Sequence, residues 1–374
     1  MDEPPPAGLT VGVPKERVPN ERRVALVPDA AGDLIRAGLR VIVESGAGDA
    51  ANLSDDAYRE AGAEIVSGPA EAYDAEIVAK VQPPLIEEIE LFRPGSLLLS
   101  FLESKRDADL IERLADRGVR AFSFNAVPRV TRAQSMDALS AMSTVAGYKA
   151  VLIAADTIGR FFPLLMTAAG TVPPARVVVI GAGVAGLQAL ATARRLGAVT
   201  FACDARPAVR EQIQSVGATF IDMSVPAEAA EGQGGYAKEM GDEILRLERD
   251  AIRDDIAGAD VVISTAQVPG ARAPLLIDEA MVEAMRPGSV IVDLAAETGG
   301  NCELSVPGET VERHGVTILA PFNLPSTVPV HASQMYARNV VTVIKYLTKA
   351  GTLNLDPSDE IVSAAVLTAV PAAT

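Results

Sequence analysis

The stretch RVVVIGAGVAG, residues 176–186, decides the fold of this chain. It begins as a β-branched run typical of a buried parallel strand, and glycines at 181, 183 and 186 complete a GxGxxG pattern. Apolar residues at helical spacing follow through residue 196, and a second apolar run, residues 199–203, ends at Asp204. The order strand, glycine turn, helix, strand and acid is that of a dinucleotide-binding βαβ unit.

Each part of this unit has a physical task. Gly181 permits the tight turn, Gly183 lets the backbone approach a pyrophosphate, and Gly186 lets helix and strand pack closely. The N–H groups of the helix start meet the pyrophosphate charge. Asp204 can accept hydrogen bonds from the adenosine ribose and would repel a 2′-phosphate, which favours NAD over NADP although Arg206 follows two residues later. A purely structural glycine turn is the alternative.

We expect the nucleotide to lie at the carboxyl ends of the strands, where open parallel sheets bind ligands. Beyond the three glycines and Asp204, the predicted contacts are Val184, Ala185, Ala205, Arg206, Ala266, Leu294 and Glu297.

Composition limits the class of protein. The chain has 374 residues, of which 49% are hydrophobic, enough for two globular domains. A net charge of −16 argues against nucleic acid or an anionic membrane surface as a partner. Cys203 and Cys302 cannot form a structural zinc site, and we expect no metal. Since no stretch reaches the ~18 apolar residues that span a bilayer and residues 1–6 fit neither a signal nor a transit peptide, we expect a soluble chain.

Alternating strand and helix patterns predict an α/β fold with two Rossmann-like, doubly wound parallel-sheet domains and a nucleotide cleft between them. The first domain comprises residues 1–135 completed by 331–374, with strands at residues 9–13, 40–43, 76–80, 96–101 and 119–124. The NAD-binding domain comprises residues 136–330, with strands at residues 177–180, 199–203, 219–221, 261–265, 290–294 and 316–319.

Other segments connect or extend these domains. Residues 134–162 predict a long crossing helix, residues 167–174 a linker, residues 331–350 a C-terminal helix, and residues 361–374 a loosely ordered end or a docking segment. Residues 228–253 interrupt the rhythm with a polar, glycine-rich stretch around Tyr236. Composition alone leaves that insertion open as a surface loop or a functional lid.

Acid–base catalysts are scarce in this sequence. Its two histidines, His314 and His331, lie where a solvated, capping or helix-start role is the default. A reaction that transfers only a hydride needs no such catalyst, because positioning the two reacting carbons can supply most of the rate. Arg129, Gln134 and Asp137 gather at the domain junction as candidate positioning residues, and an ordinary helix start is the alternative.

Long stretches of the chain carry a family resemblance. They are GVPKE…NERRVALVP at 12–28, VAKVQPP at 78–84, RAQSMDALS at 132–140, MTAAGTVPPARVVVIGAGVAGLQALATARRLGA at 166–198, GGYAKEMGDE at 234–243 and RPGSVIVDLAAETGGNCELS at 286–305. On these residues the chain resembles the NAD(H)-binding component of proton-translocating nicotinamide nucleotide transhydrogenase and, more distantly, alanine dehydrogenase.

The resemblance implies a reaction and partners. Hydride would pass directly between NADH on this chain and NADP⁺ on an NADP(H)-binding component, coupled to proton translocation by a membrane-spanning component. The chain would be a separate, homodimeric subunit on the cytoplasmic face of the membrane. The family's arginine–glutamine–aspartate triad falls on Arg129, Gln134 and Asp137, its ribose acid on Asp204, and its mobile loop on residues 234–243, with Tyr236 closing over the nucleotide.

Alanine dehydrogenase is the alternative within the same resemblance. In that relative an arginine and a lysine hold the substrate carboxylate, and Arg23 and Lys80 match them. Its catalytic histidine and aspartate are replaced here by Glu103 and Glu297, which leaves no evident proton relay for an amino acid. Arg23 and Lys80 then become framework ion-pair residues. A non-catalytic NAD sensor is a further alternative.

Overall fold

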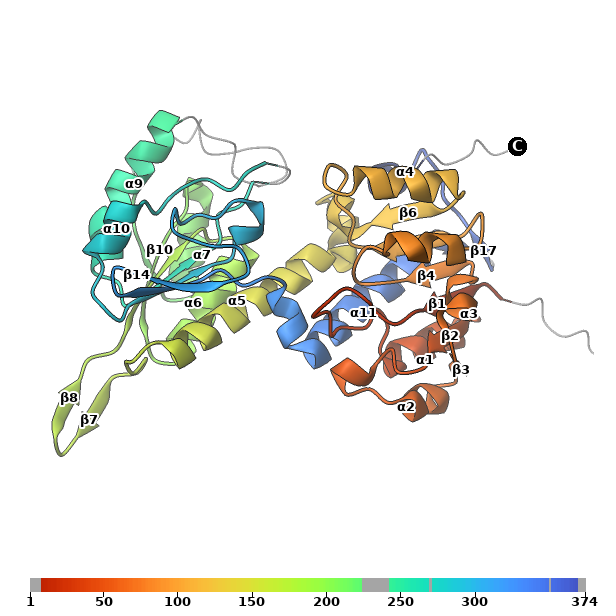
Figure 1. The fold of residues 1–374 in the computed structure, drawn as a ribbon, viewed down its shortest axis with the longest axis horizontal. Helices are drawn as coiled ribbons and strands as arrows, with labels where there is room; N and C mark the ends of the chain where they lie inside the picture. Colours follow the sequence, from red (N-terminus) through yellow and green to blue (C-terminus); the bar gives the residue numbers. More distant parts are fainter. Residues whose placement is uncertain (1–7, 224–241, 269–270, 350, 369–374) are drawn as a thin grey trace, which may run out of the picture. The chain divides into compact units, whose positions relative to one another are not determined.

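The computed structural model describes residues 8–223, 242–268, 271–349 and 351–368 (Figure 1). The chain divides into two compact units, each with its own parallel sheet. Unit 1 comprises residues 1–142 and 325–374, and unit 2 comprises residues 143–324. The expected fold class, two Rossmann-like parallel sheets in an α/β protein, is confirmed.

Unit 1 is built on a six-stranded parallel sheet in the order β3-β2-β1-β4-β5-β6. The central strands are apolar and buried along nearly their whole length, as a sheet covered on both faces requires. The third strand was not predicted, because it has three residues and one of them is exposed. The strands are β1 (Thr10–Val13), β2 (Arg40–Glu44), β3 (Glu64–Val66), β4 (Ile77–Ala79), β5 (Leu97–Ser100) and β6 (Arg120–Ser123).

Helices and short turns connect the strands of unit 1 and complete it from the C-terminal region of the chain. The α-helices are α1 (Pro28–Arg36), α2 (Asp55–Glu60), α3 (Pro69–Tyr73), α4 (Ala108–Asp116), α11 (Pro329–Leu347) and α12 (Glu360–Ala365). The 3₁₀ turns are η1 (Asp49–Ala51), η2 (Ile86–Leu91), η3 (Phe124–Ala126) and η4 (Thr131–Met136), and a small hairpin joins β16 (Thr348–Lys349) to β17 (Thr352–Leu353).

The end of the described chain docks on the edge strand of this sheet. The backbone N–H of Leu367 donates to the Ala121 carbonyl at 2.8 Å, and the Thr368 hydroxyl accepts from the Ala121 N–H at 3.0 Å. Val366 forms an antiparallel bridge with Phe122. Of the two alternatives for residues 361–374, docking therefore holds for residues 361–368, and residues 369–374 lie outside the described chain.

Unit 2 contains a seven-stranded sheet in the order β11-β10-β9-β12-β13-β15-β14. All six predicted strands are present and parallel, whereas β14 pairs antiparallel with β15 and was missed because it is mostly exposed and polar. The strands are β9 (Arg176–Ile180), β10 (Val199–Cys203), β11 (Thr219–Phe220), β12 (Val261–Ser264), β13 (Val290–Asp293), β14 (Thr310–Arg313) and β15 (Val316–Leu319).

Helices cover both faces of this sheet, and alternate strand residues serve the two faces. Val177 and Val179 pack with α6 (Val184–Arg195), α7 (Arg210–Ser215) and a portion of α5 (Ala138–Thr157). Val178 and Ile180 pack with α9 (Asp242–Ala257) and α10 (Glu279–Ala284) on the other face. The 3₁₀ turns of this unit are η5 (Pro207–Val209) and η7 (Ala296–Thr298), and η8 (Leu324–Thr327) lies at the unit boundary.

Three connecting segments differ from expectation. Helix α5 is long and apolar enough to cross a membrane by length and composition, whereas the sequence analysis expected no such stretch; 39% of its apolar window is buried, with Ala150, Val151 and Ala154 in the unit 2 core. The expected linker 167–174 instead contributes to a hairpin of β7 (Leu165–Thr167) and β8 (Gly170–Val172) (Figure 1). The second half of the expected insertion 228–253 is helical, because Leu245, Ile252 and Ile256 give α9 an apolar face to bury.

Candidate functional site

The strand order of unit 2 reverses beside β9. Strands β10 and β11 follow on one side of β9, whereas β12 and β13 lie on the other side. Loops that leave β9 and β12 therefore diverge at the carboxyl edge of the sheet, and this crevice is where doubly wound sheets bind ligands. The glycine turn follows β9 at this point and runs directly into α6.

The three glycines differ in what surrounds them. Gly181 has a φ of +87°, and a Cβ there would lie 2.9 Å from the Thr265 hydroxyl. A Cβ on Gly186 would lie 1.9 Å from the Gly181 carbonyl oxygen, so helix and turn can touch only without a side chain. At Gly183, the N-cap of α6, a Cβ would meet no atom of the described residues within 4 Å. Two glycines are thus required by packing, and the third faces open space beside a helix N-terminus.

Asp204, which follows β10, is hydrogen-bonded to this turn. Its Oδ2 accepts from the backbone N–H of Ala182 at 2.7 Å and from Arg206 Nη2 at 2.8 Å. Its Oδ1 accepts from Arg206 N and Arg206 Nε, both at 2.9 Å. The side chain is buried, and neighbouring Ala205 packs partly buried against the α9 side of the sheet. The predicted acid and glycine turn therefore meet, together with Arg206.

The loops after β12 and β13 carry the remaining unit 2 candidates. The Asn301 side chain binds both backbone polar groups of Ala266. Its Oδ1 accepts from the Ala266 N–H at 3.1 Å, and its Nδ2 donates to the Ala266 carbonyl at 2.9 Å. The Leu294 carbonyl accepts from the Gln267 side chain at 3.0 Å. Glu297 is exposed and accepts from the Asn323 N–H at 3.2 Å.

A buried carboxylate organises these loops and was missed by the sequence analysis. Asp293 has no exposed surface and accepts from the N–H groups of Ala295, Asn301 and Cys302 at 2.9–3.1 Å. It also accepts from the hydroxyls of Ser264 at 3.0 Å and Ser305 at 2.7 Å. An acid that ends a buried strand and precedes a Gly-Gly-Asn turn was the available signal.

A second missed acid lies on α9. Glu248 shares the apolar face of that helix with Ile252 and is 2% exposed. Its Oε1 has no hydrogen-bond partner among the described residues. Burial, and secondarily the charge of Asp204, raise the pKa of the Glu248 carboxyl to about 7. A glutamate at an apolar position of a helical repeat was the signal.

The predicted triad lies in unit 1. Gln134 is exposed on η4, and Arg129 is exposed on the segment before it. Asp137 immediately precedes α5, and its carboxylate accepts from the Ser140 N–H at 2.9 Å and the Ser140 hydroxyl at 2.6 Å. Asp137 therefore caps the start of α5, which agrees with the helix-start interpretation for this residue.

Contacts within unit 1 hold the triad segment in place. Arg132 forms ion pairs with Asp359 and Glu360, both at 3.0 Å, and Asn339 of α11 donates to the Ser135 carbonyl at 2.8 Å. The segment that carries Gln134 is therefore anchored by its neighbours on both sides.

The remaining sequence candidates have simple environments. His314 has a φ of +51° and its Nε2 lies 3.0 Å from Glu279 Oε1, while His331 is exposed in the first turn of α11. Cys203 and Cys302 are free and buried, and burial raises the pKa of both thiols. Tyr236 lies outside the described residues.

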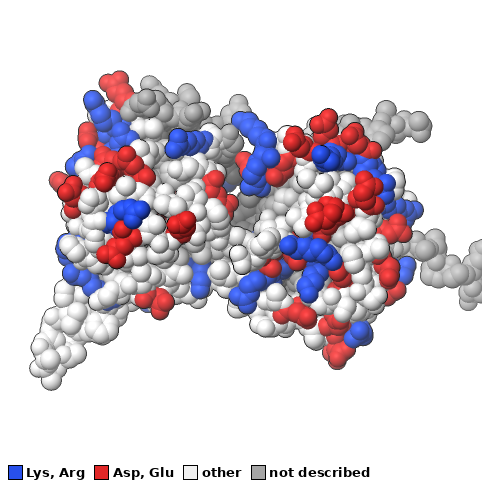
Figure 2. Space-filling view, in the orientation of Figure 1, with Lys and Arg blue, Asp and Glu red and all other residues white. Residues whose placement is uncertain are grey.

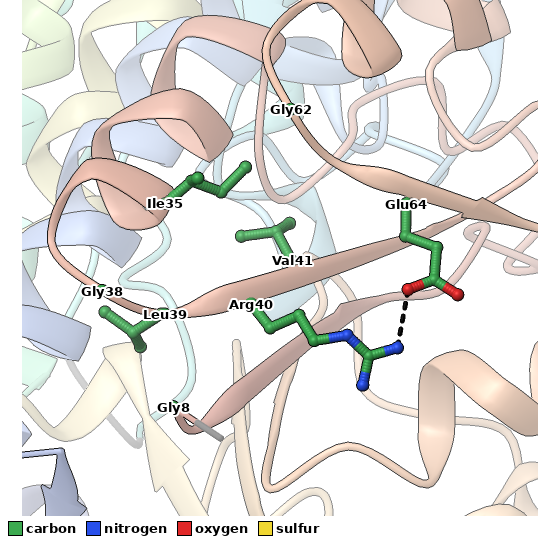
Figure 3. A pocket seen from close by; sticks show the side chains of 8 residues that line it. All are labelled: Gly8, Ile35, Gly38, Leu39, Arg40, Val41, Gly62 and Glu64. Atoms are coloured by element: carbon green, nitrogen blue, oxygen red, sulfur yellow. Dashed lines mark hydrogen bonds and ion pairs between the residues drawn. The ribbon is translucent and has the colours of Figure 1, made fainter. Parts of the chain in front are cut away.

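A pocket of about 370 Å³ lies in unit 1, near the amino ends of β1, β2 and β3 (Figure 3). An exposed ion pair between Arg40 Nη2 and Glu64 Oε2, 2.6 Å apart, crosses it. It contains none of the predicted site residues, and the carboxyl-edge crevice of unit 2 remains the candidate site.

Comparison with known proteins places the chain. Models of the alanine dehydrogenase/PNT N-terminal and C-terminal domains match residues 12–146 and 150–372. The chain belongs to the alanine dehydrogenase/PNT family. It is 46% identical to an NAD(P) transhydrogenase subunit alpha chain of Rhodospirillum rubrum, over 96% of each chain.

Two further comparisons set a transhydrogenase and an alanine dehydrogenase side by side. The crystal structure of a transhydrogenase from Sinorhizobium meliloti matches with a TM-score of 0.87 at 41% identity, covering 96% of this chain and 98% of that one. Alanine dehydrogenase of Bacillus subtilis is 35% identical over 86% of this chain and 81% of its own length. Within the family, the chain is thus more similar to these transhydrogenase relatives.

The positions matched to alanine dehydrogenase are occupied by internal ion pairs. Arg23 Nη2 lies 2.6 Å from Glu21 Oε2, with both side chains at most 3% exposed. Lys80 Nζ is fully buried, 3.4 Å from Glu16 Oε2 and 3.6 Å from Glu88 Oε2. The framework interpretation of Arg23 and Lys80 agrees with these contacts. Glu103, at the histidine position, pairs at the surface with Arg106 at 3.5 Å.

Proposed function

We propose that this chain binds NAD(H) at the glycine turn of unit 2 and passes hydride directly between that nucleotide and NADP(H) held by a partner subunit. The observation that carries the proposal is the Asp204 carboxylate hydrogen-bonded to the glycine turn at 2.7 Å. It occurs in a chain 46% identical, over 96% of its length, to a transhydrogenase alpha subunit. The nicotinamide supplies the hydride when it is bound.

The residues present fit such a dinucleotide. Open space at Gly183 leaves room for a pyrophosphate, and the first N–H groups of α6, at Val184 and Ala185, have no intrahelical acceptor and favour an anion. We assign Ala205, Ala266, Leu294 and Glu297, which follow β10, β12 and β13 at the carboxyl ends of the strands, to the walls of the same site. Asp204 lies where the acid of such a site meets the adenosine ribose, and a ribose hydroxyl there would compete with the Arg206 donors for its oxygens.

We assign the positioning role to Gln134 on the basis of the family resemblance. Gln134 is exposed on an anchored turn, and its amide can both donate and accept without changing charge. Arg129 can meet a phosphate or carboxamide nearby, while Asp137 holds the start of α5. Such a set suits a reaction whose rate depends on holding two reacting carbons in place rather than on proton transfer.

The assembly that we propose is a homodimer that docks, through partner subunits, on a membrane-spanning component. That component couples hydride transfer to proton translocation. The β7–β8 hairpin is the candidate surface for the dimer contact. The projection formed by the β7–β8 hairpin is free of Lys, Arg, Asp and Glu, as are all residues from 161 to 175 (Figure 2). Met166 of this hairpin is 80% exposed. Exposed apolar surface of this kind marks protein interfaces. Met166→Glu should shift the chain toward monomer in sedimentation, and an unchanged dimer would remove the hairpin from the interface.

The decisive experiment separates binding from transfer. The isolated chain should bind NADH but show little hydride exchange with NADP⁺, and addition of the NADP(H)-binding subunit should start that exchange. Calorimetry with NADH and NADPH measures the first step, and rapid mixing of the recombined subunits measures the second. An isolated chain that does not bind NADH would overturn the proposal.

Amino-acid dehydrogenation is the second candidate, favoured by the 35% identity to an alanine dehydrogenase. The internal pairing of Arg23 and Lys80 opposes it, because a substrate carboxylate would have to displace buried glutamates. Incubation of the chain with alanine and NAD⁺ should produce no NADH. Steady reduction by the chain alone would establish the dehydrogenase instead.

A further inference from the structure

The carboxylate of Asp204 is fully engaged by its surroundings. Both oxygens accept two hydrogen bonds, and three of the four come from Arg206: its backbone N–H, Nε and Nη2, at 2.8–2.9 Å. The Asp204 and Arg206 side chains are 6% and 18% exposed. Since charge-assisted, two-point bonds in a partly desolvated site are strong, Asp204 holds the Arg206 guanidinium in one place.

The position of the Arg206 guanidinium bears on whether the site prefers NAD(H) or NADP(H). In βαβ nucleotide sites the acid at the second strand end receives the adenosine ribose, and an arginine nearby accommodates a 2′-phosphate. Arg206 is two residues beyond the acid, and its planar donor set matches phosphate geometry. The same chain thus carries the acid of an NAD site and an arginine suited to an NADP site, in direct contact.

Net charge around the pair opposes a 2′-phosphate. Glu248 of α9 lies close enough for the Asp204 charge to act on it, and it is buried with an unpartnered Oε1 among the described residues. A 2′-phosphate carries up to two negative charges, and it would meet the Asp204 carboxylate, whose one neighbouring arginine is already paired, beside a Glu248 carboxyl that is partly ionised near neutral pH. Removing the Asp204 charge lowers this repulsion and releases the guanidinium at once.

We propose that Arg206 is a latent ligand for the 2′-phosphate of NADP(H), which Asp204 keeps out of that role. This inference rests on the proposed binding of NAD(H) at the same turn. It assigns nucleotide discrimination to a contacting pair of residues rather than to the acid alone.

The test compares NADH and NADPH affinities of four purified full-length proteins by calorimetry: wild type, Asp204→Asn, Asp204→Asn/Arg206→Gln and Asp204→Asn/Arg210→Gln. Asn keeps an oxygen for the Ala182 N–H. Asp204→Asn should bind NADPH at least about tenfold more tightly than wild type does, the size of one charge-assisted hydrogen bond. The Arg206→Gln double variant should lose that gain.

The Arg210→Gln double variant is the matched control. Arg210 starts α7 and forms an ion pair with Asp222, so its loss removes equal charge without touching the pair of Asp204 and Arg206. It should keep the gain in NADPH affinity. Equal NADPH affinity in Asp204→Asn and its Arg206→Gln derivative would overturn the inference, whereas a wild-type chain that fails to bind NADH would overturn the proposed function.

A single variant guards against failure of the Asp204 variants to fold. Arg206→Gln alone should change the ratio of NADPH to NADH affinity by less than about threefold, because Asp204 already holds the guanidinium away from the 2′-phosphate. A larger, selective loss of NADPH affinity would show that Arg206 binds the 2′-phosphate in the wild type, and the inference would fail.

Discussion

The two units have the same strand order around their first strands, β1 and β9, but the segments that follow these two strands differ. In unit 2, three residues separate β9 from α6, and they form the glycine turn. In unit 1, residues 14–27 separate β1 from α1, and Glu16 and Glu21 from this segment form buried ion pairs with Lys80 and Arg23. The same topology thus leaves an open glycine turn at a helix N-terminus in unit 2 and a closed cluster of buried ion pairs in unit 1. The connection after the first strand decides which.

The largest expected effect comes from breaking the unit 1 cluster. Lys80→Met leaves the buried Glu16 and Glu88 carboxylates without their shared cation, and burial already raises the pKa of the Glu16 carboxyl. We expect unit 1 to lose about 3–5 kcal/mol of stability. Hydrogen exchange of the β1 and β4 amides measures this loss. Lys15→Met, at an exposed position of the same loop, should change it by less than about 0.5 kcal/mol. Equal effects of the two substitutions would contradict the cluster's structural role.

Next in size is the effect of Gln134 on hydride transfer. Gln134→Asn shortens the side chain by one methylene and should slow transfer to NADP⁺ on the partner about a hundredfold, because a misplacement of about 1 Å costs that much. NADH affinity should hardly change. Single-turnover mixing and separate calorimetry distinguish the two quantities. A transfer rate equal to that of wild type would remove Gln134 from the mechanism.

Glu248 should make the stability of unit 2 depend on pH. Its pKa is about 7 in the folded chain and near 4.3 when unfolded, so the folded form holds its proton more tightly. Stability should therefore fall as pH rises from about 4.5 to about 7 and stay level above. Glu248→Gln removes this term, and its free energy of unfolding relative to wild type should rise by about 2 kcal/mol between pH 5 and pH 8. Glu243→Gln, exposed on the same helix, should show no such trend in urea titrations.

The smallest effect is expected at the open glycine. Gly183→Ala places a methyl group where the part of the chain that the structure describes has no atom within 4 Å, so stability should change by less than about 0.5 kcal/mol. NADH affinity should nevertheless fall about tenfold, because the methyl group occupies the approach of the pyrophosphate. Calorimetry and thermal unfolding measure the two effects. Unaltered affinity would mean that the turn has a structural role alone.

Sequence patterns predicted the buried strands of both sheets and missed two edge strands. Buried strands such as β9 and β13 are continuous apolar runs and were found, whereas the exposed strands β3 and β14 have no such run. The glycine turn and Asp204 were found because their spacing is local. The Lys80–Glu16 and Asp293–Asn301 contacts join chain segments that periodicity cannot bring together, so they required coordinates.

The interrupted layout of unit 1 has a consequence for synthesis on the ribosome. Tyr336 of α11 is fully buried and donates to the Lys80 carbonyl at 2.6 Å, and Val366 bridges to β6, so residues far along the chain complete the first sheet. Unit 2 is contiguous and can mature while it emerges. The core of unit 1 stays incomplete on the ribosome until residues 325–374 have been synthesised, after all of residues 143–324. We therefore expect chaperones to bind the nascent residues 1–142 more than the rest of the chain.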